Sequence, residues 1–236
     1  GNVDRVVIAG AGTQGSDTIV GVTADVAPDC DGANQKVLGT LKVNRSELRD
    51  LEFGVRTSIG GGGQVDINYN SLARVGLPIS ILDANQTTTI LANKITFNDV
   101  DSYGASSGLG TTAIYVASTA ASPNNNTTTI KSNTLTDGGL SAAGTAVLVG
   151  QIEKAITHKM AVTGNTFRGI SANTAGGGLV AIDTEDGVIS GNTFISAAGT
   201  WIDISSGDSS QGFIGSDVSG WAIVANEFSG STANTD

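Results

Sequence analysis

The sequence VTGNTF at residues 162–167 recurs almost unchanged as ISGNTF at residues 189–194. Both are copies of one pattern, in which an apolar residue, two small or polar residues, Asn and any residue precede Leu, Ile or Phe. Further copies are INYNSL at 67–72, ILANKI at 90–95, IKSNTL at 130–135 and IVANEF at 223–228, while VNRSEL at 43–48 has Ser46 in the Asn place. The marker positions are therefore 46, 70, 93, 133, 165, 192 and 226. Their spacing indicates a unit of about two dozen residues, with loop insertions in the longer units.

Each unit also carries the period-two alternation of apolar residues that is typical of strands. Residues 51–55 alternate in this way, and the same pattern returns 24 residues later at 75–79. A further strand follows in most units, as in TAIYVAS at 112–118 and TWIDISS at 200–206. A short strand cannot bury its apolar face alone, whereas stacked units bury one continuous core and pair their backbones. We therefore expect an all-β fold, a single-stranded parallel β-helix of about eight coils with loop insertions, as a single domain over residues 1–236.

The marker residues are interpreted as structural. Asn tolerates the left-handed backbone conformation that a sharp bend between strands requires. Stacked Asn side chains can also form hydrogen bonds from one coil to the next. The apolar residues two positions after each marker should form an interior stack: Leu48, Leu72, Ile95, Leu135, Phe167, Phe194 and Phe228.

The composition excludes several classes of protein. A net charge of −10 disfavours a nucleic-acid partner, because phosphate binding needs basic patches. The single cysteine excludes an internal disulfide framework and a cysteine-rich zinc site. No apolar run is long enough for a membrane span. The scarcity of Lys and Cys, with abundant Gly, Thr, Asn and Ser, suggests an extracellular, cell-surface or virion protein.

The repeated turns carry a resemblance to a known family. The Asn-centred turns at Asn133, Asn165, Asn192 and Asn226, each next to alternating apolar strands, resemble those of the right-handed parallel β-helix proteins of the pectin-lyase-like superfamily. The opening DRVVIAGAGTQGSDTIV at 4–20 looks like the first coil of such proteins. The resemblance implies right-handed winding. It does not choose an activity, because the superfamily includes polysaccharide lyases, glycoside hydrolases, epimerases, phage tailspikes and adhesins.

Alternation also predicts which side chains leave the core near the end of the chain. In GLVAIDT and TWIDISS, the inward apolar residues leave Asp183, Trp201 and Asp203 pointing outward. Stacking of these two strands should bring Asp183 near Asp203, with Trp201 beside them. Glu185 and Asp186 continue from Asp183 into the following turn.

An acidic cluster beside an exposed indole suits a sugar, because the ring covers a pyranose face and carboxylates accept hydroxyl hydrogen bonds. Tyr115 and Arg56, both expected to point outward from earlier coils, complete the candidate substrate-binding set with Trp201 and Asp186. Arg56 is expected to lie too far along the rod to touch the acidic cluster. The candidate catalytic residues are Asp183, Asp203 and Glu185, because paired carboxylates support glycoside hydrolysis.

Three functions stay open: recognition of polysaccharide by an adhesin or phage-tail protein, hydrolysis or lysis of a polysaccharide, and a purely structural spacer. The lone His158 argues against a catalytic triad. The fragments at Asp29 to Gly32 and at Asp99 and Asp101 do not complete a calcium loop, so we assign neither a metal nor a cofactor. The expected partner is a glycan, and a second copy or flanking domains are expected to cover the open ends of the helix.

Overall fold

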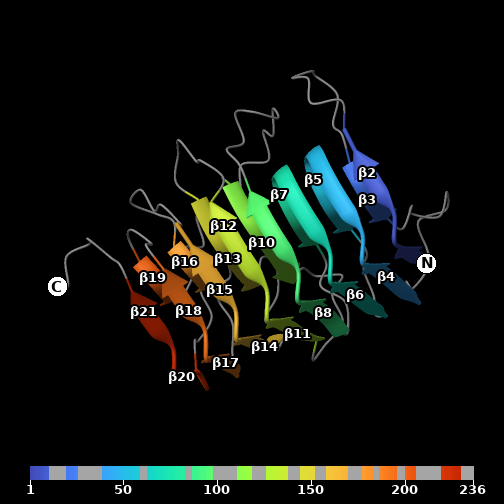
Figure 1. Ribbon diagram of the computed structural model, residues 1–236. Coiled ribbons are helices and arrows are strands. Elements are labelled where there is room, and N and C mark those ends of the chain that lie inside the picture. The colour runs from blue at the N-terminus through green and yellow to red at the C-terminus, as the bar shows by residue number, and fades with distance from the viewer. Residues whose placement is uncertain are drawn as a thin grey trace.

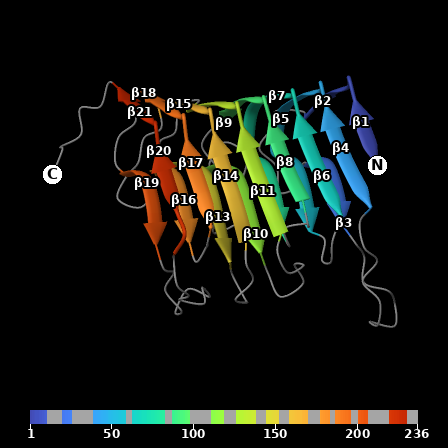
Figure 2. The same cartoon turned by 90° about the horizontal axis from the view of Figure 1, so that it is seen from below.

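The computed structural model describes residues 1–10, 20–25, 39–58, 63–82, 87–97, 111–118, 126–137, 144–151, 158–169, 177–182, 186–195, 200–205 and 219–229. Within these ranges the chain forms strands, corners and no helix, so the expected all-β class is confirmed. It follows that no described helix is long and apolar enough to span a membrane. The strands make two parallel sheets. Within each sheet, the strands of successive repeats lie side by side along the molecule (Figures 1 and 2).

Sheet 1 contains eight strands among the described residues, in the order β1-β4-β6-β8-β11-β14-β17-β20. These are β1 (Asn2–Asp4), β4 (Thr40–Asn44), β6 (Gln64–Asn68), β8 (Thr87–Leu91), β11 (Asn126–Lys131), β14 (His158–Thr163), β17 (Gly187–Ser190) and β20 (Ala222–Val224). Every pairing is parallel, so each strand bonds to the one that lies a full repeat away in the sequence. Parallel pairing requires such a long return of the chain.

Sheet 2 has two wings that meet in the long bent strands β5 (Glu47–Ser58) and β7 (Ser71–Leu82). The first wing adds β2 (Val7–Ala9), β9 (Lys94–Phe97), β12 (Thr134–Asp137), β15 (Thr166–Arg168), β18 (Thr193–Ile195) and β21 (Glu227–Ser229). The second wing adds β3 (Val20–Asp25), β10 (Thr111–Ser118), β13 (Gly144–Gln151), β16 (Gly177–Ile182) and β19 (Thr200–Ser205). A repeat is thus a sheet 1 strand, a corner, and the sheet 2 strand or strands that follow.

The first corner, between sheet 1 and the first wing, always has two residues. The first of them has a positive φ of 49–63°: Arg5, Arg45, Tyr69, Ala92, Ser132, Gly164, Gly191 and Ala225. The second is the marker residue, which has no positive φ. The expectation that the marker Asn adopts the left-handed conformation is therefore wrong, because the preceding residue makes the bend.

The marker residues instead form a buried hydrogen-bond ladder. Asn93, for example, accepts bonds on Oδ1 from the backbone N–H (2.9 Å) and Nδ2 (3.0 Å) of Asn70. Asn93 in turn donates from Nδ2 to Ile67 O at 2.8 Å and to Asn133 Oδ1 at 3.0 Å. The same pattern continues through Asn165 and Asn192 to Asn226. The expected coil-to-coil bonding of Asn is confirmed.

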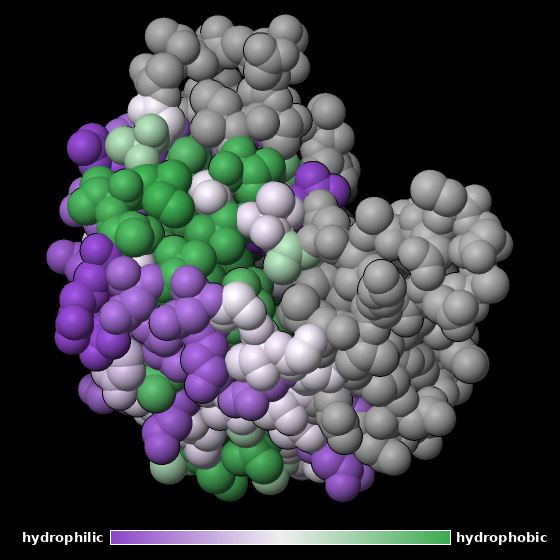
Figure 3. All heavy atoms as spheres, turned by 90° about the vertical axis from the view of Figure 1, so that its right-hand side faces the viewer, coloured by the Kyte–Doolittle hydropathy of each residue, from purple (hydrophilic) through white to green (hydrophobic). Residues whose placement is uncertain are grey.

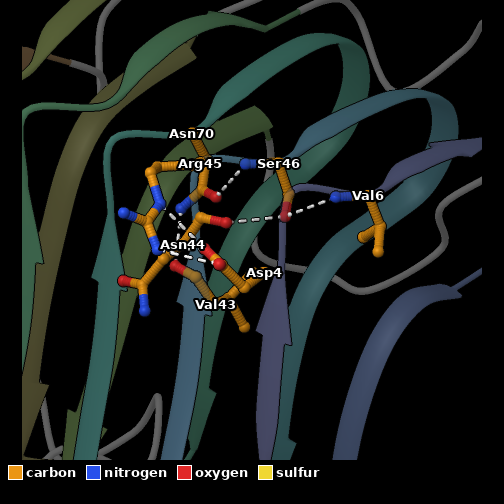
Figure 4. A network of polar contacts seen from close by, with 7 residues as sticks. All are labelled: Asp4, Val6, Val43, Asn44, Arg45, Ser46 and Asn70. Carbon is orange, nitrogen blue, oxygen red and sulfur yellow. Dashed lines mark hydrogen bonds and ion pairs between the residues drawn. The ribbon is translucent and has the colours of Figure 1, made fainter.

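Figure 4 shows where this ladder begins. Ser46 donates its backbone N–H to Asn70 Oδ1 at 2.9 Å, and its own Oγ accepts the N–H of Val6 at 3.3 Å. The Ser46 hydroxyl donates to Asn44 O at 2.8 Å. Ser46 therefore carries the ladder one repeat beyond the first Asn.

The apolar residues that follow the markers form the expected interior stack. Register aligns Ile8, Leu48, Leu72, Ile95, Leu135, Phe167, Phe194 and Phe228. Leu48 through Phe194 are buried, whereas Phe228 at the end of the stack is 50% exposed. A second interior column crosses sheet 1: Val3, Val43, Ile67, Ile90, Ile130, Val162, Ile189 and Ile223.

The second wing contributes a column of small residues that makes room for the interior stack. In successive repeats this position is held by Gly21, Gly54, Pro78, Ala113, Ala146 and Gly178, and then by Trp201. A Cβ added at Gly178 would lie 2.6 Å from the Phe194 ring, and one at Gly54 would collide with Pro78 O. Even the Cβ of an alanine would thus clash at both glycines.

Candidate functional site

Three of the residues predicted for a sugar site share one column on the outer face of the second wing. Register aligns Arg56, Ser80, Tyr115, Leu148, Val180 and Asp203 on consecutive strands. With a strand spacing of about 4.8 Å, Arg56 and Asp203 lie roughly 24 Å apart along the column. Arg56 is therefore remote from Asp203, as expected.

Tyr115 leaves the main core but does not reach solvent. It packs in a separate cluster with Phe53, Leu77 and Ala117, and only 4% of it is exposed. Burial raises the pKa of the Tyr115 phenol to about 12, because the charged phenolate would lose its hydration. The expectation that Tyr115 presents an outward ring to a ligand is wrong, since its ring is covered.

Arg56 lies at the edge of the same cluster. Its guanidinium carbon is 5.2 Å from the centre of the Phe53 ring, and its side chain is half-buried. This cation–π contact holds Arg56 against the cluster that contains Tyr115. The arrangement stabilises the outer face of the second wing at its N-terminal end.

Trp201 points into the core, so the expectation of an exposed indole is wrong. Its ring lies 6.0 Å from the Phe194 ring and 4.8 Å from the Phe228 ring, measured between centroids. The reason is that two successive residues face inward at the start of this wing. Ala113 and Ile114 are both buried in the main core, and Trp201 and Ile202 occupy the same two register positions.

Of the predicted acidic residues, the structure describes Asp203 and Asp186. Asp203 is half-buried and lies opposite Val180, which precedes Asp183 by three residues. Asp183 and Glu185 lie outside the described residues. Asp186 is exposed at a corner with φ 54°, and its N–H donates to Ser219 O at 3.0 Å.

No group of three or more His, Cys, Asp or Glu side chains that could hold a metal ion occurs within the described ranges. The calcium-like fragments around Asp29 and Asp99 lie outside those ranges. His158 is the first residue of β14, so its backbone is part of sheet 1. The described residues therefore give no reason to place an ion in the candidate site.

The first corner of β6 and β7 presents an aromatic ring that sequence reasoning missed. Tyr69 is 60% exposed, and its φ of 59° makes it the bending residue. The signal was present in INYNSL, where Tyr stands before the marker while most other copies have Ala, Ser or Gly there. Period-two alternation could not find it, because the corner lies outside both strands.

Polar residues lie next to Tyr69 in its own repeat and in the two repeats before it. Register aligns Asp4, Asn44 and Asn68 immediately before the first corner, and Arg45 is the bending residue of the preceding repeat. Asp4 accepts two bonds from Arg45, from Nε and Nη2, both at 2.8 Å (Figure 4). We call these five residues, Asp4, Asn44, Arg45, Asn68 and Tyr69, the corner patch.

The corner patch combines a flat apolar ring with carboxylate, amide and guanidinium groups. The ion pair of Asp4 with Arg45 neutralises both charges, while their remaining polar atoms and Asn44 keep hydrogen-bonding capacity. Asn68 Oδ1 is a buried acceptor that has no hydrogen-bond partner. Such a surface can contact the faces and hydroxyl groups of a sugar.

Comparisons with protein-family models, with curated proteins and with solved structures found no match for this chain.

Proposed function

We propose that the chain is a right-handed parallel β-helix of eight coils that recognises polysaccharide outside the cell or on a virion. The handedness and the likeness to the pectin-lyase-like superfamily rest on the Asn-centred turns of the sequence. The regular parallel register of sheet 1 supports the count of coils. A rigid stack of this kind can offer an extended chain of sugars a long and regular surface.

The observation that carries this proposal is the exposed ring of Tyr69 in the corner patch. Among the candidates, Trp201 is half-buried and packs on Phe194, and Tyr115 is covered, so Tyr69 is the more accessible ring. Tyr69 is 60% exposed, and polar residues lie beside it in its own repeat and in the preceding one. We therefore place the glycan contact at the corner patch instead of the acidic cluster.

A glycoside hydrolase would need two carboxylates that converge on one sugar bond. Within the described residues, Asp203 and Asp186 are the predicted acids that can be placed, and Asp203 lies opposite an apolar residue. The purely structural alternative draws support from the buried Asn ladder, which stiffens the stack regardless of any ligand. The experiment below separates all three functions.

The test is affinity electrophoresis of the full chain in gels that contain individual neutral and acidic polysaccharides. We expect retardation by at least one of them, and we expect Tyr69→Asn to abolish it. Asn tolerates the left-handed conformation at this corner, so the substitution removes the ring without distorting the bend. Parallel assays of reducing ends and of unsaturated products report turnover.

Ser132→Asn is the matched control, because Ser132 is exposed and has a φ of 56° at the same corner in a later repeat. It should leave the retardation unchanged. Retardation that survives Tyr69→Asn would contradict the corner patch. Product formation would favour an enzyme, and the absence of any response to glycans would favour a spacer.

A further inference from the structure

The bending residues of the first corner change in size at Tyr69. The N–H of Tyr69 donates to Leu91 O at 2.9 Å, immediately before the bending residue of the next repeat. In the four repeats that follow Tyr69, the bending residues are small: Ala92, Ser132, Gly164 and Gly191. We call these four residues the corner strip. Tyr69 therefore stands at one end of a surface of short side chains, along which a chain of sugars can run.

In the opposite direction, the first corner carries larger side chains. The bending residue there is Arg45, which Asp4 holds through two hydrogen bonds of 2.8 Å. Figure 3, which views the N-terminal end of the molecule, shows hydrophilic side chains gathered there beside an apolar area. Because the pair of Asp4 and Arg45 occupies the corner on this side of Tyr69, a glycan that lies on the ring extends along the corner strip toward the C-terminus.

Two exposed lysines flank the corner strip. Lys131, the last residue of β11, lies on the sheet 1 side of the corner, and Lys94, the first residue of β9, lies on the side of the first wing. Register places Lys94 one repeat and Lys131 two repeats beyond the repeat of Tyr69, about 5 and 10 Å along the axis. Both lysines alternate with buried neighbours, so their side chains point outward.

Most charged groups near the corner patch are neutralised by a partner. The ion pairs join Lys42 to Asp66, Arg45 to Asp4, Arg49 to Glu47 and Arg74 to Asp50. Lys94 and Lys131, by contrast, form no ion pair with any carboxylate of the described residues. Charges are screened beyond about 8 Å at physiological ionic strength, so these two ammonium groups act on a nearby ligand more strongly than the net charge of −10 of the whole chain.

We infer that the polysaccharide bound at the corner patch is a polyanion. Its sugar rings lie on Tyr69 and along the corner strip, and its carboxylate or sulfate groups form ion pairs with Lys94 and Lys131. This inference rests on the proposed glycan recognition and adds the class of glycan. An ammonium group forms charge-assisted hydrogen bonds with either anion, so the two lysines select acidic over neutral sugars.

The probes are two anionic polysaccharides and their neutral counterparts. Alginate carries carboxylates and is compared with carboxyl-reduced alginate, and dextran sulfate is compared with dextran. The two members of each pair share their linkages and differ in the anionic groups. We expect alginate or dextran sulfate to retard the full chain in affinity electrophoresis, and the neutral counterpart to bind at least about fivefold more weakly. Retardation by one or the other distinguishes carboxylate from sulfate.

Lys94→Gln combined with Lys131→Gln should lower the affinity for that polyanion about fivefold, because two exposed ion pairs are lost. The loss should shrink as the salt concentration rises, since salt screens the two charges. Lys159→Gln is the matched control, because Lys159 is also an exposed lysine of sheet 1 but lies in β14, five residues before the bend at Gly164. It changes the net charge as much as Lys131→Gln does and should leave the affinity unchanged.

The inference is overturned if neither polyanion retards the chain, if a neutral counterpart binds as tightly as its polyanion, or if Lys159→Gln weakens binding as much as Lys131→Gln. Its failure can be told from that of the proposed function. Retardation by neutral polysaccharides that Tyr69→Asn abolishes would leave glycan recognition in place and remove only the polyanion. No retardation by any polysaccharide would remove both.

Discussion

The two corners of the repeat are built in opposite ways. The first corner has two residues in each repeat that the structure describes, and its Asn side chains from Asn70 to Asn192 are buried. The second corner, between the wings of sheet 2, is an uninterrupted bend at Asp50 and Arg74 in two repeats. In later repeats the same place separates two strands, for example β9 from β10.

The difference shows where this fold accepts change. A buried rung bonds to both neighbours, so the chain cannot lengthen there without leaving donors unpaired. The bend at Asp50 is held at the surface by Arg74, whose Nε and Nη2 lie 2.6 and 2.7 Å from the carboxylate. A surface ion pair contributes little, so a loop can replace it. The length of a repeat can therefore change at the second corner but not at the first.

The largest expected effect follows from Asn133→Val. The change removes the acceptor of Asn93 and the donor to Ile90 O, all within the buried ladder. We expect the free energy of unfolding to fall by about 3–5 kcal/mol, as measured by chemical denaturation.

Asn226→Val is the matched control at the open end of the ladder, where the residue is half-buried and accepts from Asn192 alone. Its cost should be about 1–2 kcal/mol. Equal decreases in the free energy of unfolding at Asn133 and Asn226 would show that the contribution of a ladder Asn does not depend on its burial.

A smaller effect of opposite sign is expected from Ala92→Gly. Ala92 has a φ of 54°, a conformation that costs a residue with a Cβ about 1 kcal/mol, whereas glycine adopts it freely. The variant should gain about 0.5–1 kcal/mol in unfolding free energy. Ala73→Gly, in β7, should instead lose stability, and a loss at both positions would contradict the strain at the first corner.

At the second corner, Arg74→Asn should cost only about 0.2–1 kcal/mol, because its side chain is 51% exposed. Asn keeps the positive φ accessible, so the change isolates the ion pair. A double-mutant cycle with Asp50→Asn gives the coupling free energy, which should shrink in high salt. A coupling free energy as large as the stability loss in Asn133→Val would show that the second corner is as strongly held as the first.

The smallest effect concerns acid. The hydrogen bond from Arg74, opposed in part by burial, holds the pKa of Asp50 below its ordinary value of 3.8. A lowered pKa in the folded state stabilises the fold above the unfolded pKa, and this stabilisation is lost as the pH falls through the folded pKa. Asp50→Asn should flatten the pH dependence of stability below about pH 4 and leave it unchanged at neutral pH.

The sequence predicted what depends on period. The 24-residue shift that relates Leu48 to Leu72 is the observed register, and the marker spacing predicted the ladder. Alternation failed where its assumptions end. Trp201 and Ile202 both face inward, although strict alternation would turn one of them outward. Tyr115 faces away from the main core but is covered by residues of neighbouring strands, which the alternation of its own strand cannot predict.

The corner residues were misassigned for a related reason. Asn is the usual residue for a left-handed bend, but here its side chain is needed inside the ladder. The residue before it therefore adopts the left-handed conformation, even where that residue is Arg45 or Tyr69. Because this position is exposed and variable, it could host a functional ring without disturbing the register.

The parallel register also determines how the chain reaches this structure. Ladder partners are 23 to 40 residues apart in sequence, so no strand can pair with its immediate successor in a local hairpin. Each loop must close before its contacts stabilise it, which makes folding slow and its barrier mainly entropic. Once two adjacent repeats have formed, their exposed sheet edges can pair directly with the strands of the next repeat. Folding therefore proceeds along the axis by growth from a nucleus.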